Sequence, residues 1–451
     1  MHRLIAKGKT SFTARRESLP RRTGALPDYA VALVLLFVPF HAFLTVSGAH
    51  LGANYTLIRL LPECVLLLIV GWLLFSKSVK PAWRSLQQHK LAWLPASYLL
   101  VNLIYFMGTS IFGTMDVQVA AYSLLLNTRH VVWFWLVYAV ALQSDWLHRH
   151  WQRLIVFPLG IVSVFALLQF FVLPPDFLSH FGYQTGVTIT PVQTINQDTL
   201  TIRAQSTLRG PNPLGAYLVL GIGLLWVAML KISGRYLLLL LAAGAMLVSF
   251  SRSAWLGLLV TMTVWLGAKR GFMKGARVVL PFALGVFALL VSALFLLQAN
   301  QGFKNAVLHV NDQSTAEQTS NEDRLSALRI GIKDVVSEPF GRGLGTAGPA
   351  SMLEDDIPAR ISENYFLGLG QEIGWLGMGL FVTVCYRLGR SLYARKEGLA
   401  RMLFATLAGL TLVNLLSYAW ADVTLAYLWW GLAAIGLAWL PTSKKPQKQH
   451  A

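Results

Sequence analysis

The chain has 451 residues, of which 55% are hydrophobic and only 13% are charged. Soluble domains usually carry about twice that share of charged residues, so the composition argues against a soluble globular fold. The formal net charge of +18 would suit a nucleic-acid-binding protein, but the basic residues form short clusters between apolar runs. That distribution indicates a membrane protein and no nucleic-acid partner.

Apolar runs long enough to cross a hydrocarbon core of about 30 Å recur along the whole chain and predict about twelve membrane-spanning helices. The predicted spans cover residues 29–47, 58–75, 91–112, 119–142, 154–174, 213–231, 236–250, 253–268, 278–298, 364–386, 402–419 and 423–440. The seventh and eighth are short and flank Ser251-Arg252-Ser253, which leaves open one broken element instead of two spans. The first run is too long for a signal-peptide core, so we expect it to be retained.

The basic clusters predict the orientation of these spans. With both termini in the cytoplasm, 27 of the 38 Lys and Arg residues fall in predicted cytoplasmic segments, as the positive-inside rule requires. Shifting the register by one span would place the clusters outside. The predicted regions are a basic cytoplasmic arm at 1–28, spans one to nine within 29–298 with an outer loop at 175–212, a large outer loop at 299–362, the last three spans within 363–440 and a basic cytoplasmic tail at 441–451.

The large outer loop has a pattern of its own. Asn321-Glu322-Asp323 opens a helical pattern that Pro339 ends, with an apolar stripe beside Arg324. We expect this helix to lie on the membrane surface or to pack over an outer cavity. The following Gly343-x-Gly345-x-x-Gly348 matches the dinucleotide-binding fingerprint, but no buried strand precedes it, so tight turns are the better interpretation.

Two arginines that break the positive-inside pattern are candidate functional residues. Arg203 opens a segment that leads into Pro211-Asn212-Pro213, and Arg252 lies between two apolar runs. A guanidinium at a membrane boundary is costly unless it meets an anion or lines water. Its planar fork suits phosphate; pairing with a carboxylate or a lipid headgroup is the alternative.

The remaining ionisable residues predict no metal or cofactor site. The two cysteines, Cys64 and Cys385, lie inside apolar runs and cannot build a disulfide framework or a thiolate site. The consecutive acids of the large loop, at 354–356, are expected to be solvated, although clustered carboxylates also suit a divalent cation.

Near the second and fourth predicted spans, charged residues are spaced for pairing. Arg59 and Glu63 are four residues apart and are expected to pair on one helix face. Arg129 has Asp116 or a phosphate as its candidate partner.

Four pieces of the chain together resemble one known family. They are Arg203…Ser206…Pro211-Asn212-Pro213-Leu214-Gly215, Ser251-Arg252-Ser253, Arg324-Leu325…Glu338-Pro339-Phe340-Gly341-x-Gly343-x-Gly345, and Glu363-Asn364-Tyr365-Phe366-Leu367…Glu372-Ile373-Gly374-Trp375-Leu376-Gly377. In order and spacing they resemble the O-antigen ligase and O-antigen polymerase family of bacterial membrane glycosyltransferases, which includes related protein O-oligosaccharyltransferases. The resemblance covers about 200 to 390.

The resemblance implies an all-α, GT-C-like bundle in the bacterial inner membrane that acts in polysaccharide or lipopolysaccharide biosynthesis. The donor would be a glycan on undecaprenyl diphosphate or a similar polyprenyl diphosphate, presented at the outer face. The acceptor hydroxyl would belong to lipid A-core in a ligase, to another lipid-linked repeat in a polymerase, or to a protein side chain. Such enzymes are expected to invert the anomeric centre without a metal or a nucleotide cofactor.

The resemblance also assigns expected roles to residues. Arg203 and Arg252 would stabilise the leaving diphosphate. The substrate-binding candidates are Arg209, Asn212, Arg324, Asn364 and Tyr365. Glu363 stands where the family usually has a histidine, so either it is the general base or catalysis is organised differently here; His309 is the other candidate base.

Two other function classes remain open on the sequence. A transporter or flippase of lipid-linked glycans would spread charges through several spans and often contain internal repeats. A non-catalytic protein of envelope assembly would not need outward arginines. The gathering of unusual charges beside the outer loops favours the glycosyltransferase, but the sequence does not separate ligase, polymerase and oligosaccharyltransferase.

Overall fold

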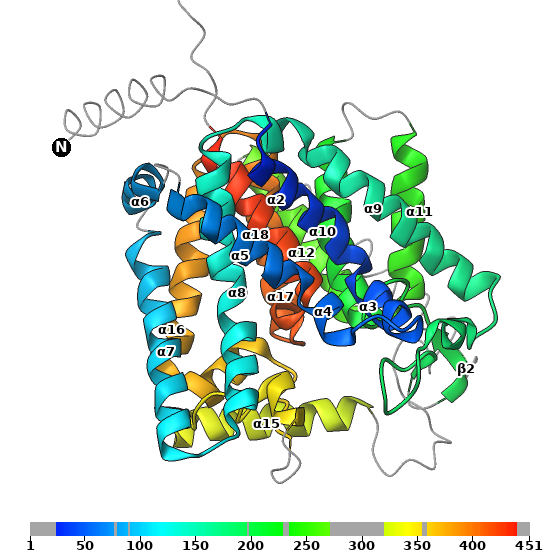
Figure 1. The fold of residues 1–451 in the computed structure, drawn as a ribbon. Helices are drawn as coiled ribbons and strands as arrows, with labels where there is room; N and C mark the ends of the chain where they lie inside the picture. The colour runs from blue at the N-terminus through cyan, green and yellow to red at the C-terminus, as the bar shows by residue number, and fades with distance from the viewer. Residues whose placement is uncertain are drawn as a thin grey trace, which may run out of the picture.

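The computed structural model describes residues 24–75, 79–88, 91–195, 198–228, 234–270, 320–353 and 359–439. Within these ranges the chain is mostly helical, with one two-stranded antiparallel sheet. Figure 1 shows the long helices packed side by side as a bundle. The predicted helical class is therefore confirmed for this part of the chain.

The first half of the bundle is built from apolar helices interrupted at polar or proline positions. Its elements are α2 (Leu26–Phe37), η1 (Val38–Phe40), α3 (His41–His50), α4 (Tyr55–Arg59), α5 (Leu61–Phe75), α6 (Val79–Gln88), α7 (Trp93–Phe112), α8 (Val117–Ala141), α9 (Trp146–Phe171) and η2 (Phe177–Phe181). Asp116 begins α8, where its Oδ1 accepts from the N–H of Gln118 at 2.6 Å, and Gly113 ends α7 in a left-handed conformation. Both are usual helix-end signals.

The second half begins with a hairpin and continues with helices. Its elements are β1 (Gln193–Ile195), β2 (Asp198–Arg203), α10 (Pro211–Ala228), α11 (Arg235–Val248), α12 (Arg252–Arg270), α15 (Ser320–Ser337), η5 (Gly348–Leu353), α16 (Tyr365–Tyr393), α17 (Gly398–Asn414), η6 (Ala419–Ala421) and α18 (Val423–Ala438). The helix predicted from Asn321 to Pro339 is present as α15.

The centre of the bundle is α18. Every residue from Thr424 to Ala438 is buried, as expected for a helix that is apolar all round. It packs most extensively on α8, while α12 and α17 form another close pair. At that crossing, a Cβ on Gly409 would lie 2.2 Å from the carbonyl oxygen of Gly257, so glycine allows the two backbones to approach.

Within the described ranges, six helical segments are long and apolar enough to cross a membrane, or seven if the pair α5 and α6, bent by 102°, is one span. The six are Leu26–His50, Trp93–Phe112, Val117–Ala141, Trp146–Phe171, Pro211–Ala228 and Tyr365–Tyr393. Helices α11, α17 and α18 are apolar but shorter. The chain is thus a multi-pass membrane protein, but the count of twelve is not confirmed, and the predicted span 278–298 lies outside the described residues.

The predicted seventh and eighth spans are two separate helices, α11 and α12. Both pack against α10, and the turn Ser249–Ser251 joins them. The α15 helix lies across one end of the bundle, and β2 lies at that same end, whereas α6 lies at the opposite end (Figure 1). Elements β2 and α15, which fall within the two predicted outer loops, therefore share one end of the molecule.

One predicted ion pair is wrong. Glu63 lies not with Arg59 but 3.6 Å from Nη1 of Arg129, whose Nη2 donates to the carbonyl of Ala421. Arg59 instead stacks on the ring of Tyr122, with its Cζ 4.7 Å from the centroid. The guanidinium of Arg129 is buried, so it requires a carboxylate partner more than the half-buried Arg59 does.

Candidate functional site

The guanidinium of Arg203 is held by neutral acceptors. Its Nε donates to the carbonyl of Ser249 at 3.0 Å, and its Nη2 donates to Oδ1 of Asn212 at 2.8 Å and to the carbonyl of Phe250 at 3.4 Å. Ser249 and Phe250 belong to the turn before α12, and Asn212 lies in the first turn of α10. Arg203 therefore joins the ends of three helices without losing its positive charge to a carboxylate at these contacts.

Arg252 and Arg324 bring further positive charge to Arg203. Burial, followed by the positive charges of Arg324 and Arg252, lowers the pKa of Arg203 to about 10. These three residues, the arginine cluster, come from β2, the start of α12 and the first turns of α15. Gathering like charges where solvent is partly excluded costs free energy, so the arrangement favours an anion among them.

Two helix N-termini strengthen this preference. The first turns of α10 and α12 pack closely, because a Cβ on Gly215 would lie 2.7 Å from the Cβ atoms of Ser251 and Ala254. Helix N-termini carry partial positive charge and unpaired N–H groups, and they commonly bind phosphate. The arginine cluster and these two helix ends together form a candidate anion site.

Backbone strain marks the same segments. Within the described ranges, the non-glycine residues with positive φ are Ser206 at 53°, Phe250 at 48° and Glu363 at 52°. Each lies in a segment that the sequence singled out. Such conformations cost about 1–3 kcal/mol each and persist only where the surroundings enforce them. For Ser206, the side chain of Gln169 accepts from its N–H at 2.8 Å, and its own Oγ donates to the carbonyl of Val162 at 2.8 Å.

The other candidates before α10 differ in their placement. Asn212 orients Arg203, as described above. The side chain of Arg209 is exposed, and no described contact links it to the arginine cluster. The structure therefore brings together Arg203, Asn212, Arg252 and Arg324, and leaves Arg209 at the rim.

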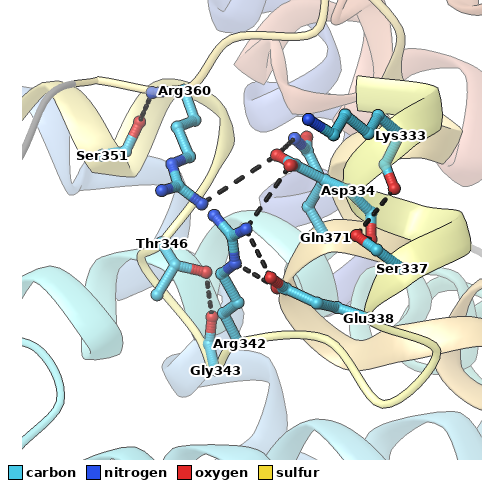
Figure 2. Close-up of polar contacts among 10 residues, drawn as sticks. All are labelled: Lys333, Asp334, Ser337, Glu338, Arg342, Gly343, Thr346, Ser351, Arg360 and Gln371. Carbon is cyan, nitrogen blue, oxygen red and sulfur yellow. Dashed lines mark hydrogen bonds and ion pairs between the residues drawn. The ribbon is translucent and has the colours of Figure 1, made fainter. Parts of the chain in front are cut away.

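A network of charged side chains fixes α15, which carries Arg324, to the rest of the chain. Figure 2 shows Arg342 paired with Glu338 and with Asp334, whose Oδ1 is 3.4 Å from Nη2 of Arg342. Arg360 approaches the other oxygen of Asp334 at 3.9 Å, and the Nε2 of Gln371 donates to it at 2.9 Å. The hydrogen bond to Arg342 lowers the pKa of the Glu338 carboxyl. The network joins α15 to the next turn and to α16.

The glycine-rich segment after α15 forms tight turns. Gly341, Gly343, Gly345 and Gly348 all have positive φ, which glycine adopts without strain. The only sheet among the described residues is the β1–β2 hairpin. The positive φ values agree with the interpretation of this segment as tight turns.

Glu372 was given no role from the sequence, but the structure places it in a buried hydrogen-bond network. Its Oε1 accepts from Oγ of Ser123 at 2.7 Å and from the N–H of Gly345 at 2.9 Å, and its Oε2 accepts from Nδ2 of Asn127 at 2.8 Å. It immediately precedes a break in α16, where Gly374 has a φ of 64°. The sequence did contain a signal for this residue, because a carboxylate inside a predicted apolar span is rare and needs polar partners.

Glu372 also lines a small cavity with Ser123, Asn127, Tyr365 and Tyr418. Its volume of about 10 Å³ is enough for roughly one water molecule. These polar residues line a space too small for a sugar, so we assign this region a structural role.

Glu363, Asn364 and Tyr365 lie at the start of α16, and they differ in burial and in their contacts. Glu363 is half-buried. The Oδ1 of Asn364 accepts from the N–H groups of Phe366 and Leu367 at 2.9 and 3.1 Å, and its Nδ2 donates to the carbonyl of Leu415, so it is a helix cap. Tyr365 is buried at 2% exposure against Phe381.

The middle of α15 lies close to Glu363. A Cβ on Gly331 of α15 would be 2.6 Å from Cβ of Ser362, the residue before Glu363 in the chain. Arg324 is seven residues earlier on the same helix, about 10 Å along its axis. Glu363 therefore faces the same end of the bundle as the arginine cluster but stands apart from Arg324. The other candidate base, His309, and the acids Glu354, Asp355 and Asp356 lie outside the described residues.

Comparison with protein families gives a match over part of the chain. Residues 237–382 match the model of the O-antigen ligase family, which supports an enzyme of glycosyltransferase-like ligase type with a lipid-linked glycan donor and an acceptor. The matched range includes Arg252, Arg324, Glu363 and Glu372; Arg203 and Asn212 precede it. A comparison with curated proteins gave no match. The chain is thus a multi-pass membrane protein whose residues 237–382 match the O-antigen ligase family.

Proposed function

We propose that the chain transfers a glycan from a polyprenyl diphosphate carrier to an acceptor hydroxyl at the outer face of the bacterial cytoplasmic membrane. The observation that carries this proposal is the convergence of Arg203, Arg252 and Arg324 at the N-termini of α10 and α12. A diphosphate is the donor group that this concentration of positive charge would recognise. The family match over 237–382 supports the same class of reaction.

In this reaction the acceptor oxygen attacks the anomeric carbon, and the bond from that carbon to the diphosphate oxygen breaks. Negative charge grows on the diphosphate as the bond breaks. Fixed cations already aimed at that position stabilise the transition state more than the bound donor. Arg203 is suited to this because the carbonyls of Ser249 and Phe250 and the amide of Asn212 hold its guanidinium in place.

The acceptor hydroxyl must lose its proton as the new bond forms. We assign this proton to the carboxylate of Glu363, which is half-buried and held at the start of α16 with a φ of 52°. A carboxylate beside the diphosphate would repel it electrostatically. Glu363 is separated along α15 from Arg324 of the arginine cluster, where the diphosphate would bind, and this distance reduces the repulsion. Glu363 thus occupies the acceptor side, and the arginine cluster occupies the donor side.

A reconstituted transfer assay tests this proposal. Proteoliposomes receive a polyprenyl-diphosphate-linked oligosaccharide and, in separate reactions, lipid A-core, a second lipid-linked oligosaccharide or an acceptor peptide. The acceptor that is glycosylated distinguishes ligase, polymerase and protein O-oligosaccharyltransferase.

In this assay Arg203→Ala and Arg252→Ala are expected to abolish transfer by correctly folded protein. Arg209→Ala and Arg329→Ala are controls, because each removes an exposed arginine: Arg209 follows Arg203 in the segment before α10, and Arg329 lies on α15, the helix that carries Arg324. Full activity in the two cluster variants would refute the proposed diphosphate site.

A further inference from the structure

Helix α15 presents a different chemistry on each of its sides. The side toward the bundle is small or apolar: Gly331 packs on Ser362, and a Cβ on Gly370 would lie 2.9 Å from Cγ2 of Val335. The side away from the bundle carries Ser326, Ser337 and Lys333, of which both serines are exposed. These two sides are those of an ordinary surface helix.

The two flanks of α15 differ from each other. One flank carries Asp334, which contacts Arg342 and Arg360 (Figure 2), and so faces the turn and the segment that follow α15. The other flank carries Leu325, Ile332 and Val336, spaced by seven and four residues, which places them in one row. All three are exposed, Val336 at 65%. An apolar flank beside a polar outer side is unusual for a helix bathed in water.

The apolar flank continues onto a predicted span. Just beyond the end of α15, Phe340 is 81% exposed. Trp375 and Leu376 of α16 are also exposed, and the N–H of Trp375 donates to the carbonyl of Pro339 at 2.8 Å. These two residues belong to Tyr365–Tyr393, a helix long and apolar enough to cross a membrane. The row on α15 is therefore continuous with the exposed apolar surface of a helix that could cross a membrane.

We propose that α15 lies in the plane of the membrane interface, with Leu325, Ile332, Val336 and Phe340 inserted among the acyl chains of the adjoining leaflet. Three observations identify lipid as the occupant: the continuity with the surface of α16, the orientation of α15 across the end of the bundle (Figure 1), and the exposed Arg329 and Lys333 side of the helix. Basic residues beside an apolar row are suited to anionic headgroups. Ile330, also exposed, falls outside the row.

This placement has a consequence for the arginine cluster. Arg324 is on the side of α15 that faces the bundle, and a helix at the interface holds it at the level of the lipid headgroups. A diphosphate whose tail remains in the membrane would meet the cluster at that level. The membrane contact itself does not depend on the proposed reaction, because it follows from the exposed side chains of α15.

Spin-label accessibility in proteoliposomes tests the proposal. Single cysteines are introduced in a full-length chain that also carries Cys64→Ser and Cys385→Ala. The flank variants are Ile332→Cys and Val336→Cys, and the matched variants from the outer side are Ser326→Cys and Ser337→Cys. We expect oxygen, which concentrates in lipid, to relax the flank labels several-fold more than the serine-site labels, and a water-soluble nickel complex to do the reverse.

Two results would overturn the proposal. Equal exposure of all four labels to the nickel complex would mean that water covers the flank. Flank labels that are immobile and shielded from both reagents would mean that protein, either a second copy or another segment of this chain, covers it. A fluorophore on the same cysteines, quenched by brominated lipids only at 332 and 336, gives an independent reading. None of these measurements requires transfer activity, so failure here is distinct from failure of the proposed function.

Discussion

Arg203 donates from Nη2 to Oδ1 of Asn212 across 2.8 Å, and this bond ties strand β2 to the first turn of α10. The acceptor is an uncharged amide, so it orients the guanidinium without cancelling its charge. An aspartate at this position would accept the same hydrogen bond and neutralise the cluster in part. The orientation and the charge of Arg203 can thus be separated experimentally.

We predict that Asn212→Asp raises the midpoint of thermal unfolding and lowers transfer. The new carboxylate would pair with a guanidinium that is now surrounded by like charges, which stabilises the fold. The same pairing competes with the diphosphate and should lower kcat/KM by at least about tenfold, or about 1.4 kcal/mol. Calorimetry and steady-state kinetics on one preparation provide both readouts. Wild-type kcat/KM in Asn212→Asp would contradict the electrostatic account.

Neutralising Arg324 should also stabilise the protein while weakening its affinity for anions. The pKa of Arg203 is below its ordinary value because burial and the other arginines disfavour its charged form, so at neutral pH the folded chain is destabilised by keeping the charge. Arg324→Gln removes part of that cost. An anion that binds only the folded state at about 100 times its Kd would stabilise it by roughly 2.7 kcal/mol. We therefore expect pyrophosphate to raise the unfolding temperature of wild type more than that of Arg324→Gln.

The exposed Arg329 supplies the control for that comparison. Arg329 lies on α15 about one and a half turns after Arg324. Arg329→Gln removes the same charge and should leave the response to pyrophosphate at the wild-type value. An equal loss of response in both variants would mean that net charge, not the cluster, is being measured.

Substitutions at Glu363 separate its charge from its strained backbone. Asparagine tolerates a positive φ better than glutamate, so Glu363→Asn should fold at least as well as wild type. Loss of a general base typically costs about 10²–10⁴ in rate, and we expect a loss in kcat of that order. Glu363→His restores a base and should recover activity, with a pH profile shifted toward the histidine pKa of about 6.5. An unchanged pH–rate profile in all three proteins would remove Glu363 from catalysis.

Replacing the buried Glu372 should destabilise the fold strongly. In Glu372→Ala the hydroxyl of Ser123, the amide of Asn127 and the N–H of Gly345 would lose their acceptors. Each buried group left unsatisfied costs about 1–3 kcal/mol, so the free energy of unfolding should fall by at least 3 kcal/mol or so. Glu372→Gln keeps one acceptor oxygen and should cost less. Chemical denaturation measures the difference; equal stability of Glu372→Ala and wild type would contradict the role of Glu372 in holding the turn.

The ion pair between Glu338 and Arg342 predicts a dependence of α15 docking on pH. The pKa of Glu338 is lowered in the folded state, so its carboxylate stabilises the fold fully at pH values above the unfolded pKa of about 4.3. That contribution is lost as the pH falls through the lowered folded value. Wild type should thus be more stable than Glu338→Gln at pH 7, and the difference should disappear in strong acid. A constant difference across that range would exclude this ion pair as its cause.

Local patterns in the sequence predicted local structure well. The polar start and Pro339 define α15 within two residues, because a capping segment and a proline act through neighbouring backbone groups. The positive φ values of Gly343 and Gly345 likewise follow from the turn that the glycines require. The apolar runs located helices, but their lengths did not settle how many cross the membrane.

Pairings between distant segments were less predictable. Glu63 and Arg59 satisfied the spacing for a helical pair, yet the packing of α5 on α8 brought Glu63 to Arg129. Glu372 was visible as an acid in an apolar run, but its donors come from residues near 123 and 345. Tyr365, expected at the substrate, packs in the core. Such contacts depend on tertiary packing, which spacing along one helix does not encode.

The central claim is that Arg203, Arg252 and Arg324 form a diphosphate site. The most direct measurement is the affinity of the reconstituted protein for a short prenyl diphosphate, determined by calorimetric titration for wild type, Arg203→Ala, Arg252→Ala and Arg324→Ala. Arg209→Ala serves as the control with the same loss of charge. The account predicts that wild type and Arg209→Ala bind alike and that each cluster variant binds at least about tenfold more weakly, or about 1.4 kcal/mol. Equal affinity across all five proteins would contradict it.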